Sequence, residues 1–294
     1  MKSAPFDYVR PKSAHEVCAL LVQNEDACII AGGQTLVPMM AMRLARPRLL
    51  VDIARIPELA GVRLDGDALV IGATTRQVEV ERSPLVAAKA PLLAAALPWV
   101  GHAATRNRGT VGGSVANADP AAEIPLVATT LGAQILVLEP GGHRAVVADE
   151  FFVGPMMTSM SAGSCVTAIR FPVWKHAHIG AAFHEVSVRT SDFALAAAAA
   201  QVALDAEGRC IACAIGIGGA PPVPTRLDHA GRSLVGTTLS DEAIHVAIAA
   251  AIDALEIMTD PHASTAYRRR AAQALAVRAL ADARDGASRR GAAT

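Results

Sequence analysis

A strand that ends in two consecutive glycines is the feature that most constrains the fold of this chain. Ala27 to Ala31 form an apolar run, and Gly32-Gly33-Gln34-Thr35-Leu36 follow directly. Ser13-Ala14-His15-Glu16, ahead of this run, has the form of a helix capping box, and the pattern at Leu49 to Ile53 indicates a further strand. The start of the chain therefore predicts a β-α-β-like unit with a tight glycine turn at a strand end.

This turn has the properties of an anion-binding loop. Glycines at 32 and 33 permit positive φ angles and a close approach by a ligand. Successive N–H groups can form a nest for an anion, and a short helix expected over Leu36 to Leu44 would add its N-terminal dipole. The pyrophosphate of a dinucleotide is a natural occupant, whereas an ordinary strand-to-helix turn is the alternative interpretation. A Rossmann fingerprint and a Walker loop are both excluded, because the third glycine of the first and the Gly-Lys-Ser/Thr of the second are missing.

A second glycine-rich segment lies between residues 105 and 125. Its polar stretch contains Gly109, Thr110, Gly112, Gly113 and Ser114, followed by Asn117, Asp119 and Glu123. Glycines let backbone donors reach a ligand, while amides and carboxylates suit ribityl or ribose hydroxyls. In the alternative interpretation, Asp119 and Pro120 only begin the helix expected over Ala121 to Leu131. That alternative leaves Asn117 and the Gly-Gly pair unexplained.

The rest of the chain predicts a mixture of helices and strands. Ser83-Pro84 begins a long helix to about Leu97, and a shift in composition near Phe171-Pro172 marks a boundary. We expect a hairpin of Ala194 to Leu204 with Cys210 to Ile217, although alanine by itself favours helix. Further helices are expected from Ser240 and over about His262 to Ala283. Other expected strands cover Ala68 to Gly72, Gln134 to Leu138 and a hairpin partner at Val146-Val147.

Composition excludes several classes of function. The 27 basic and 27 acidic residues give a formal charge of zero, which offers no electrostatic reason to bind nucleic acid or an anionic membrane. No signal core or membrane-length apolar run is visible, so we expect a soluble, cytoplasmic protein. Since 52% of the residues are hydrophobic, partner subunits are expected to cover part of the surface. The 294 residues suffice for about two domains.

Several other residues predict no site. The five scattered cysteines form no disulfide framework and no iron–sulfur ligand set. Cys210 and Cys213 form a lone C-x-x-C, whose side chains should point to opposite faces of a strand. The nine histidines show no ligand spacing, and Gly216 to Gly219 is expected to be a strand end because Pro221-Pro222 follows it. Arg268 to Arg270 is expected to be an exposed helix face.

Together, the two glycine segments resemble the flavin-binding signatures of the medium subunit of molybdenum hydroxylases. In that family the first signature is A-G-G-x-[ST]-L-x-P and the second is R-N-x-G-T-x-G-G-x-x-x-x-x-D-P-x-x-[DE]. Phe183-His184-Glu185-Val186, with Arg189 and Asp192-Phe193-Ala194, is similar to a third family segment. The resemblance extends over residues 4 to 285, and relatives include the flavin subunits of carbon monoxide dehydrogenase and of N-heterocycle hydroxylases.

The resemblance implies an α+β fold. A two-lobed FAD-binding domain of the vanillyl-alcohol oxidase type would span residues 1–173, with lobes of about 1–55 and 56–173. A smaller C-terminal α+β domain with an antiparallel sheet would span residues 174–285, and residues 286–294 would form a mobile tail.

The resemblance also implies a set of FAD contacts. Ala31 to Leu36 would wrap the pyrophosphate, and Gly109, Thr110, Gly112, Gly113 and Ser114 would contact it from the second lobe. Asn117, Asp119 and Glu123 would lie on its ribityl or phosphate side, and Val166 would pack on the flavin ring. His184 stands where several relatives have a lysine near the flavin; the alternative is a strand-surface histidine.

The implied function is electron transfer by one subunit of a larger enzyme. FAD in this chain would receive electrons from the 2Fe-2S clusters of a small subunit and pass them to an external acceptor. Substrate would be oxidised at molybdopterin in a large subunit, and the whole would be a dimer of heterotrimers. Two alternatives are a flavin-free scaffold paralogue and a self-contained flavin oxidase.

Overall fold

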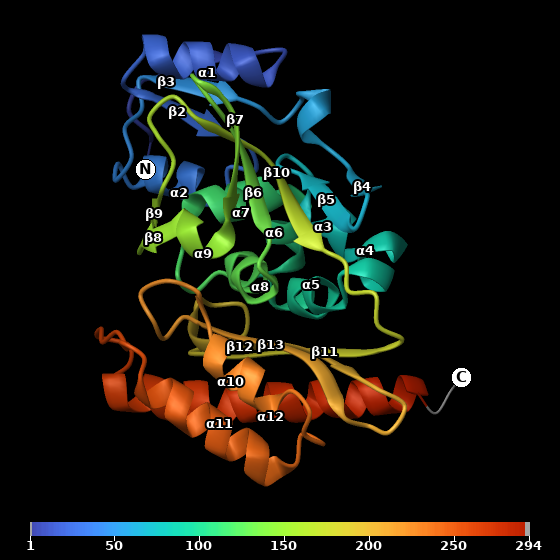
Figure 1. The fold of residues 1–294 in the computed structure, drawn as a ribbon. Coiled ribbons are helices and arrows are strands. Elements are labelled where there is room, and N and C mark those ends of the chain that lie inside the picture. Colours follow the sequence, from blue (N-terminus) through green and yellow to red (C-terminus); the bar gives the residue numbers. More distant parts are fainter. Residues whose placement is uncertain (1, 292–294) are drawn as a thin grey trace.

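The computed structural model describes residues 2–291, which form two parts stacked one above the other (Figure 1). The part up to about residue 174 contains a small parallel sheet and a larger antiparallel sheet with helices. The remaining part is a four-stranded antiparallel sheet with three helices on its outer face. This arrangement confirms the predicted α+β class.

The first lobe is built on a three-stranded parallel sheet in the order β1-β3-β2. Ser13 caps its helix as predicted, since the Ser13 hydroxyl accepts a hydrogen bond from the Glu16 N–H at 3.2 Å. Val17 on this helix packs with Val51 and Ile53 in a small core. The elements are β1 (Asp7–Val9), α1 (Ala14–Gln23), β2 (Ala27–Ile30), α2 (Leu36–Ala41) and β3 (Leu49–Asp52).

The second lobe surrounds a five-stranded antiparallel sheet in the order β4-β5-β10-β6-β7. Its central strand, β10, is the last of the five in sequence, and the bulge between Val166 and Ala168 shifts its register against β6. β8 and β9 form a short antiparallel pair. The strands are β4 (Val62–Asp65), β5 (Ala68–Gly72), β6 (Gln134–Glu139), β7 (Gly142–Val147), β8 (Phe152–Gly154), β9 (Met157–Thr158) and β10 (Cys165–Pro172).

One helix prediction in this lobe is wrong in detail. The long helix expected to reach Leu97 is interrupted at Ala90-Pro91, because Pro91 has no N–H to continue the helical hydrogen bonds. The polar stretch over residues 105–120 contains the end of one short helix, α6, and the whole of another, α7. The helices and helical turns of the lobe are η1 (Pro57–Leu59), α3 (Gln77–Glu81), α4 (Pro84–Lys89), α5 (Pro91–Ala96), η2 (Leu97–Trp99), α6 (Ala103–Arg108), α7 (Val111–Asn117), α8 (Glu123–Leu131) and α9 (Ala148–Phe151).

The alanine-rich segment is the central part of the C-terminal sheet, as the hairpin prediction required. Ala196 to Ala200 are buried because α5 and α8 cover one face of the sheet and α12 covers the other. Small side chains on both faces allow these layers to approach closely. The elements are β11 (His178–Ser187), β12 (Ala194–Leu204), β13 (Cys210–Gly218), β14 (Thr225–Arg226), α10 (Asp228–Leu234), α11 (Asp241–Asp253) and α12 (Thr265–Gly291).

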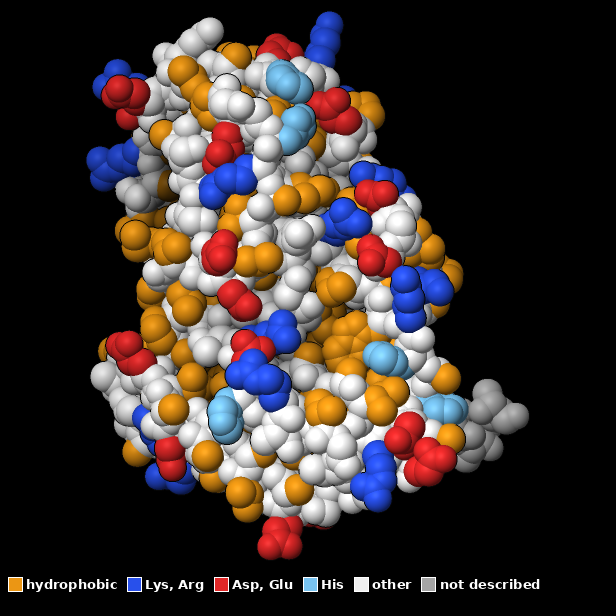
Figure 2. Space-filling view, viewed as in Figure 1, with side chains coloured by type: hydrophobic (Ala, Val, Ile, Leu, Met, Phe, Trp, Pro, Cys, Tyr) orange, Lys and Arg blue, Asp and Glu red, His pale blue; other side chains and the backbone are white. Residues whose placement is uncertain are grey.

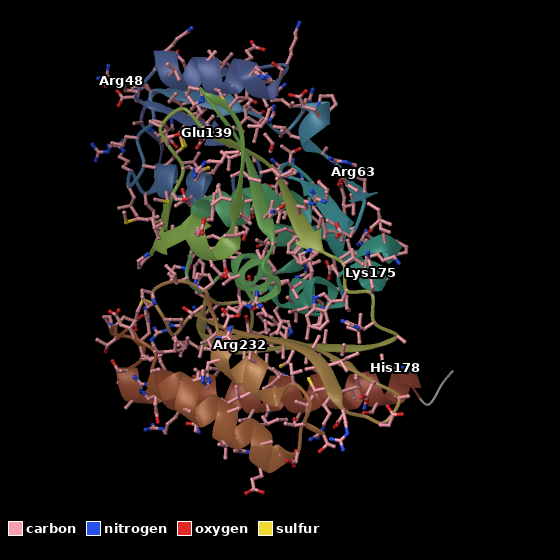
Figure 3. The ribbon with its side chains drawn as sticks, viewed as in Figure 1. Arg48, Arg63, Glu139, Lys175, His178 and Arg232 are labelled. Atoms are coloured by element: carbon pink, nitrogen blue, oxygen red, sulfur yellow. The ribbon has the colours of Figure 1, made fainter. Side chains whose placement is uncertain are left out.

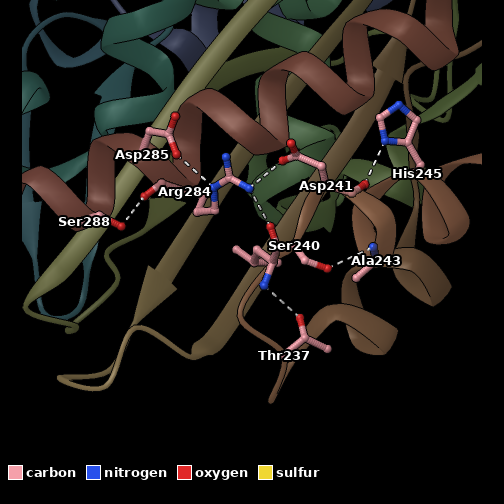
Figure 4. Close-up of polar contacts among 9 residues, drawn as sticks. Thr237, Ser240, Asp241, Ala243, His245, Arg284, Asp285 and Ser288 are labelled. Atoms are coloured by element: carbon pink, nitrogen blue, oxygen red, sulfur yellow. Dashed lines mark hydrogen bonds and ion pairs between the residues drawn. The ribbon is translucent and has the colours of Figure 1, made fainter.

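Helix α12 extends further than predicted. It continues to Gly291 rather than ending near Ala283, so residues 286–291 of the expected mobile tail are helical, and residues 292–294 lie outside the described residues. Arg284 connects it to the start of α11, donating to the Leu239 carbonyl and to the Asp241 carboxylate, both at 2.8 Å (Figure 4). Ser240 caps α11 as predicted, by accepting from the Ala243 N–H.

The prediction of an exposed arginine face on α12 is also wrong. Arg268 is buried, and its guanidinium donates to the carbonyls of Leu195 and Gly219 and to the Asp260 carboxylate. Arg269 donates to the Ile252 carbonyl at 2.5 Å, so only Arg270 of the three is exposed. Three consecutive helical residues point in three directions, and the position of the sheet decides which one is covered.

The surface carries acidic and basic side chains interspersed with apolar ones (Figure 2). Within residues 2–291, no helix combines the length and the apolar composition that a membrane crossing would need.

Candidate functional site

The first glycine segment follows the carboxyl end of β2, at the edge of the parallel sheet. Gly33 has a φ of +71°, which favours glycine. Within the described part of the chain, the N–H groups of Gly32, Gly33, Gln34 and Thr35 donate no hydrogen bond to another protein group. Four successive N–H groups without a protein acceptor are what an anion-binding loop requires.

The second glycine segment is held in place by a short backbone ladder. The Gln77 N–H donates to the Gly109 carbonyl at 2.9 Å, and the Val111 N–H donates to the Thr75 carbonyl at 3.1 Å. Thr110 pairs with Arg76 between these bonds and caps α7 by accepting from the Gly113 N–H. The segment therefore has a fixed backbone conformation.

The two glycine segments touch each other. A Cβ atom added to Gly32 would overlap the Arg108 carbonyl oxygen and would lie 2.9 Å from the Gly109 Cα. Real Cβ atoms do not approach backbone this closely, so the contact exists only because residue 32 is glycine. The structure thus brings Ala31 to Leu36 of the first lobe together with Gly109 and its neighbours in the second.

The other glycines of the second segment have different environments. A Cβ on Gly112 would overlap Ala73, so Gly112 serves the packing of α7 against the end of β5. Gly113 is exposed, and a Cβ there would meet only the Thr110 side chain. Gly113 and the partly exposed Ser114 therefore lie on the solvent-exposed side of α7.

Asn117 and Asp119 lie at the carboxyl end of α7. The Asn117 amide nitrogen lies 3.9 Å from the Met156 sulfur, next to Ala118, whose φ is +51°. Asp119 accepts from the Ala121 N–H at 2.9 Å, and burial raises the pKa of its carboxyl. Asp119 does not cap α8 as predicted, because α8 begins at Glu123 with Ala122 as its N-cap.

Glu123 faces a second carboxyl that the sequence patterns do not single out. Burial raises the pKa of Glu123 to about 7, with a further contribution from Asp119. Burial also raises the pKa of Glu185 on β11 to about 8, and the charge of Glu123 adds to this effect. One Glu185 carboxyl oxygen is buried without a hydrogen-bond partner among the described residues. The two domains therefore place two carboxyls near each other at their boundary.

Val166 is buried on β10, in the same core as α7 and α8. The next residue, Thr167, accepts through its carbonyl from the Ala73 N–H, and the Ala73 carbonyl accepts from the Gly112 N–H, both at 2.9 Å. Val166 is thus connected through two backbone hydrogen bonds to the second glycine segment.

His184 does not lie with the other candidate residues. Its Nε2 lies 2.7 Å from the Asp282 carboxylate on α12, on the outer face of the sheet. Its neighbours Phe183 and Glu185 face the first domain instead, as the Trp99–Phe183 ring contact at 6.2 Å shows. Side chains alternate along a strand, so the expected contact of His184 with a flavin is not supported, and Glu185 occupies the inward position.

Gln77 is a further residue that the sequence analysis missed. Its side chain is buried behind Gly109, where an added Cβ would overlap the amide oxygen. That oxygen has no hydrogen-bond partner among the described residues. Gly109 is therefore enclosed between Gly32 on one side and Gln77 on the other.

The residues at this site fit a dinucleotide. Side-chain-free backbone from both lobes meets there, the unpaired N–H groups suit a diphosphate, and no group of three or more potential metal ligands is found within residues 2–291. Glycine loops contributed by two lobes of an α+β domain define a class of protein that binds a phosphate-bearing cofactor between its lobes.

Comparisons with known proteins identify this class. Residues 4–174 match the family described as the FAD binding domain in molybdopterin dehydrogenase, and residues 181–283 match the CO dehydrogenase flavoprotein C-terminal domain. The chain is 38% identical over 284 residues to the 6-hydroxypseudooxynicotine dehydrogenase complex subunit alpha of Paenarthrobacter nicotinovorans, covering 96% of each chain. It is 36% identical over 276 residues to the carbon monoxide dehydrogenase medium chain of Afipia carboxidovorans, covering 94% of this chain and 95% of that one.

Solved structures agree with these matches. Carbon monoxide dehydrogenase from Hydrogenophaga pseudoflava superposes with a TM-score of 0.93 at 36% identity, covering 97% of this chain and 99% of that one. Quinoline 2-oxidoreductase from Pseudomonas putida 86 superposes with a TM-score of 0.92 at 35% identity, covering 98% and 99%. The chain belongs to the family of FAD-binding medium subunits of molybdenum hydroxylases, which are oxidoreductases of several subunits.

Proposed function

We propose that this chain transfers electrons through its FAD, from the 2Fe-2S clusters of a small partner subunit to an external acceptor. The direct contact between Gly32 and the Arg108-Gly109 backbone carries the proposal, because it closes two bare backbone segments around one site. Bound flavin supplies the capacity to exchange electrons with a neighbouring centre. The chain's own residues bind it, orient it and exclude water around it.

We assign different roles to the residues proposed to bind FAD. Ala31 to Leu36 offer four unpaired N–H groups to the diphosphate, and Gly113 and Ser114 face it from α7. Gly109, Thr110 and Gly112 hold the second segment in place through their backbone and packing contacts. Asn117, Asp119 and Glu123 supply amide and carboxyl groups for cofactor hydroxyls, and Val166 supplies an apolar surface for the ring.

The proposed domain boundaries follow the two family matches. The FAD-binding domain would span residues 1–173 with lobes of about 1–55 and 56–173, and the C-terminal domain would span residues 174–285. The segment between the matches, residues 175–180, leads into the first strand of the C-terminal sheet.

The proposed assembly contains a large molybdopterin subunit and the small 2Fe-2S subunit, as a dimer of heterotrimers. Relatives are named as a medium chain of carbon monoxide dehydrogenase and as a subunit of a dehydrogenase complex. Substrate oxidation is assigned to the large subunit, so this chain needs no substrate-oxidising residue of its own.

The test uses the complex purified from its native source. We expect one FAD per copy of this chain, with flavin absorbance that bleaches under anaerobic conditions when a substrate of the large subunit is added. Bleaching should disappear when the small subunit is removed. A colourless chain would instead identify a scaffold paralogue. Turnover of an alcohol by the isolated chain would identify a self-contained oxidase and overturn the proposal.

A further inference from the structure

An open cavity lies where the two domains meet, beside the segment that joins them. Its volume is about 500 Å³, which is within the range of sites that hold small molecules. The end of α8 contributes Leu131 from the first domain, and β13 contributes Ala212 to Ala214 from the second. Trp174 and Lys175 come from the joining segment, where Figure 3 labels Lys175. The flavin site uses none of these residues.

The walls of the cavity are largely apolar. Leu131, Val173 and Val235 line it, and the half-buried Trp174 stands beside them. The Trp174 ring packs perpendicular to the His176 ring, with 6.0 Å between the ring centroids. A flat aromatic molecule can pack on an indole ring of this kind while aliphatic side chains shield it from water. The walls therefore favour an aromatic ligand.

Strand β13 directs an unpaired peptide N–H toward this cavity. The Leu227 N–H donates to the Ile215 carbonyl at 2.8 Å from outside β12 and β13. Alternate residues of an antiparallel strand direct their peptide groups to the same side, so Cys213 faces this edge as well. β14 pairs only with Gly216 and Ile217, and within the described residues the Cys213 N–H has no acceptor on this edge. It is free to donate to an oxygen atom of a ligand.

The Cys213 side chain packs elsewhere. Cys210 and Cys213 both pack against the core on the outer face of the sheet. The register of β13 against β12 shifts between the partners of Ala203 and Leu204. The expectation that the two cysteines point to opposite faces is therefore wrong. Ala214 packs on the inner face instead, with the core of the first domain, so its small side chain leaves room for a ligand.

One cation at the mouth of the cavity has no carboxylate partner. Lys175 is exposed, and it takes part in no ion pair within residues 2–291. Arg226 also lines the cavity, but Asp228 pairs with it at 2.8 Å. Among the described residues, none with a carboxylate lines the cavity. The mouth therefore presents the charge of Lys175 to an anionic group.

We propose that this cavity binds a planar aromatic molecule that carries a single anionic group. The ring packs on Trp174 between the aliphatic walls. The anionic group lies at the mouth beside the Lys175 ammonium, and one of its oxygens accepts from the Cys213 N–H. Since the lining residues belong to both domains and to the segment between them, a bound molecule also raises the stability of the folded chain.

Fluorescence titration of the FAD-loaded full chain tests the site. Trp99→Phe leaves Trp174 as the only tryptophan, and the dye anilinonaphthalene sulfonate is the probe. We expect one equivalent of dye to quench Trp174. Phenylnaphthylamine, which has the same rings without the sulfonate, should bind about fivefold more weakly because it lacks the charge. Lys175→Gln should remove this difference, whereas Lys89→Gln, on the exposed side of α4, should keep it.

A second variant fills the cavity. Ala212→Phe places a ring in it and should abolish quenching by both probes. Flavin content and far-UV circular dichroism verify the fold of each variant. Sulfonate dye that binds without quenching Trp174, or that binds to Lys175→Gln as tightly as before, would overturn the proposal. Quenching that survives in a folded Ala212→Phe protein would overturn it as well.

Discussion

Gly32 and Gly109 lie back to back, and a side chain at position 32 would force the two lobes apart. The cost is larger than the ordinary loss of a turn glycine, because the obstructing atoms are backbone and cannot rotate away. The geometry of the flavin site therefore requires residues without a Cβ at both positions.

We predict that Gly32→Ala lowers FAD retention sharply and destabilises the protein by about 2 kcal/mol or more. The measurements are the flavin-to-protein ratio after gel filtration and the free energy of unfolding. Gly141→Ala is the matched control, since a Cβ on that exposed turn glycine meets nothing within 4 Å. Equal flavin content in the two variants would contradict the prediction.

The buried carboxyl of Glu185 predicts a dependence of stability on pH. Its pKa is raised from 4.5 to about 8, so the folded protein keeps a proton that the unfolded chain has released. Between these values the unfolded state binds fewer protons, and the free energy of unfolding falls as pH rises. Stability from this group is complete below about pH 4.5 and is lost by about pH 8.

Glu185→Gln should therefore stabilise the protein at about pH 9 by on the order of 2 kcal/mol, relative to its effect at about pH 5. This is less than the full shift implies, because the side chain keeps some contact with solvent. Denaturant unfolding at both pH values measures it, with the exposed Glu207→Gln as control. A difference that is the same at both pH values would rule out the proposed protonation.

Sequence patterns predict the residues that stand in a motif. They miss the residues whose role depends on what packs around them. Gly32, Gly109 and Asn117 stand in recognisable motifs. Gln77 stands in no motif, and Glu185 stands in the third family segment without a predicted role, because the burial of both arises only when distant segments pack. The prediction for His184 rests on the family resemblance alone, and the sequence does not show which face of the strand is inward.

At the scale of elements, β11 and α12 pack against each other without room for a side chain at Gly180. A Cβ on Gly180 would overlap the Ala283 carbonyl oxygen and lie 2.5 Å from the Ala287 N. Gly286, on the same helix, has room for a Cβ, whose only neighbour would be the Gly180 Cα at 3.7 Å. A Cβ is thus excluded at Gly180 and accommodated at Gly286, although the two glycines face each other.

We predict that Gly180→Ala destabilises the protein by about 3 kcal/mol or more, because α12 must move off the sheet. Gly286→Ala should instead stabilise it by up to about 1 kcal/mol, since alanine is the better helix former. Thermal and denaturant unfolding measure both variants. Equal effects of the same sign would show that this helix does not contact β11 as described.

Element predictions succeed where local pattern and tertiary setting agree. The capped helix α1 and strand β2 were predicted because polar caps and apolar runs are local features. The alanine strand β12 could be predicted only from the segments beside it in the sequence, since its own composition favours helix. Pro91 interrupts a stretch whose composition favours helix, and the register shift of β13 between the partners of Ala203 and Leu204 has no sequence signature.

At the scale of the whole molecule, the two domains share one continuous core. Phe183, Ala197 and Ala199 of the C-terminal sheet pack with Leu92 and Leu126 of the second lobe. Separating the domains would expose this surface to water, at a cost of about 25 cal/mol for each Å² of apolar area.

We therefore expect the full chain to unfold in a single transition, with calorimetric and van't Hoff enthalpies in agreement. A fragment of residues 1–174 should bind a hydrophobic dye and aggregate, because α5 and α8 lose the sheet that covers them. Scanning calorimetry and light scattering measure these properties. A monomeric fragment with its own cooperative transition would show that the domains are energetically independent.

The position of β10 has a consequence for synthesis on the ribosome. β5 and β6 emerge early but are held apart until residues 165–172 arrive to fill the gap between them. At about 5–20 residues per second, the nascent chain carries an open sheet for several seconds. The alanine strand β12 stays uncovered for longer still, since the helix that packs on it, α12, follows it in the chain. The sheet that supports the second glycine segment is therefore completed only after Gly109 to Ser114 have already been synthesised.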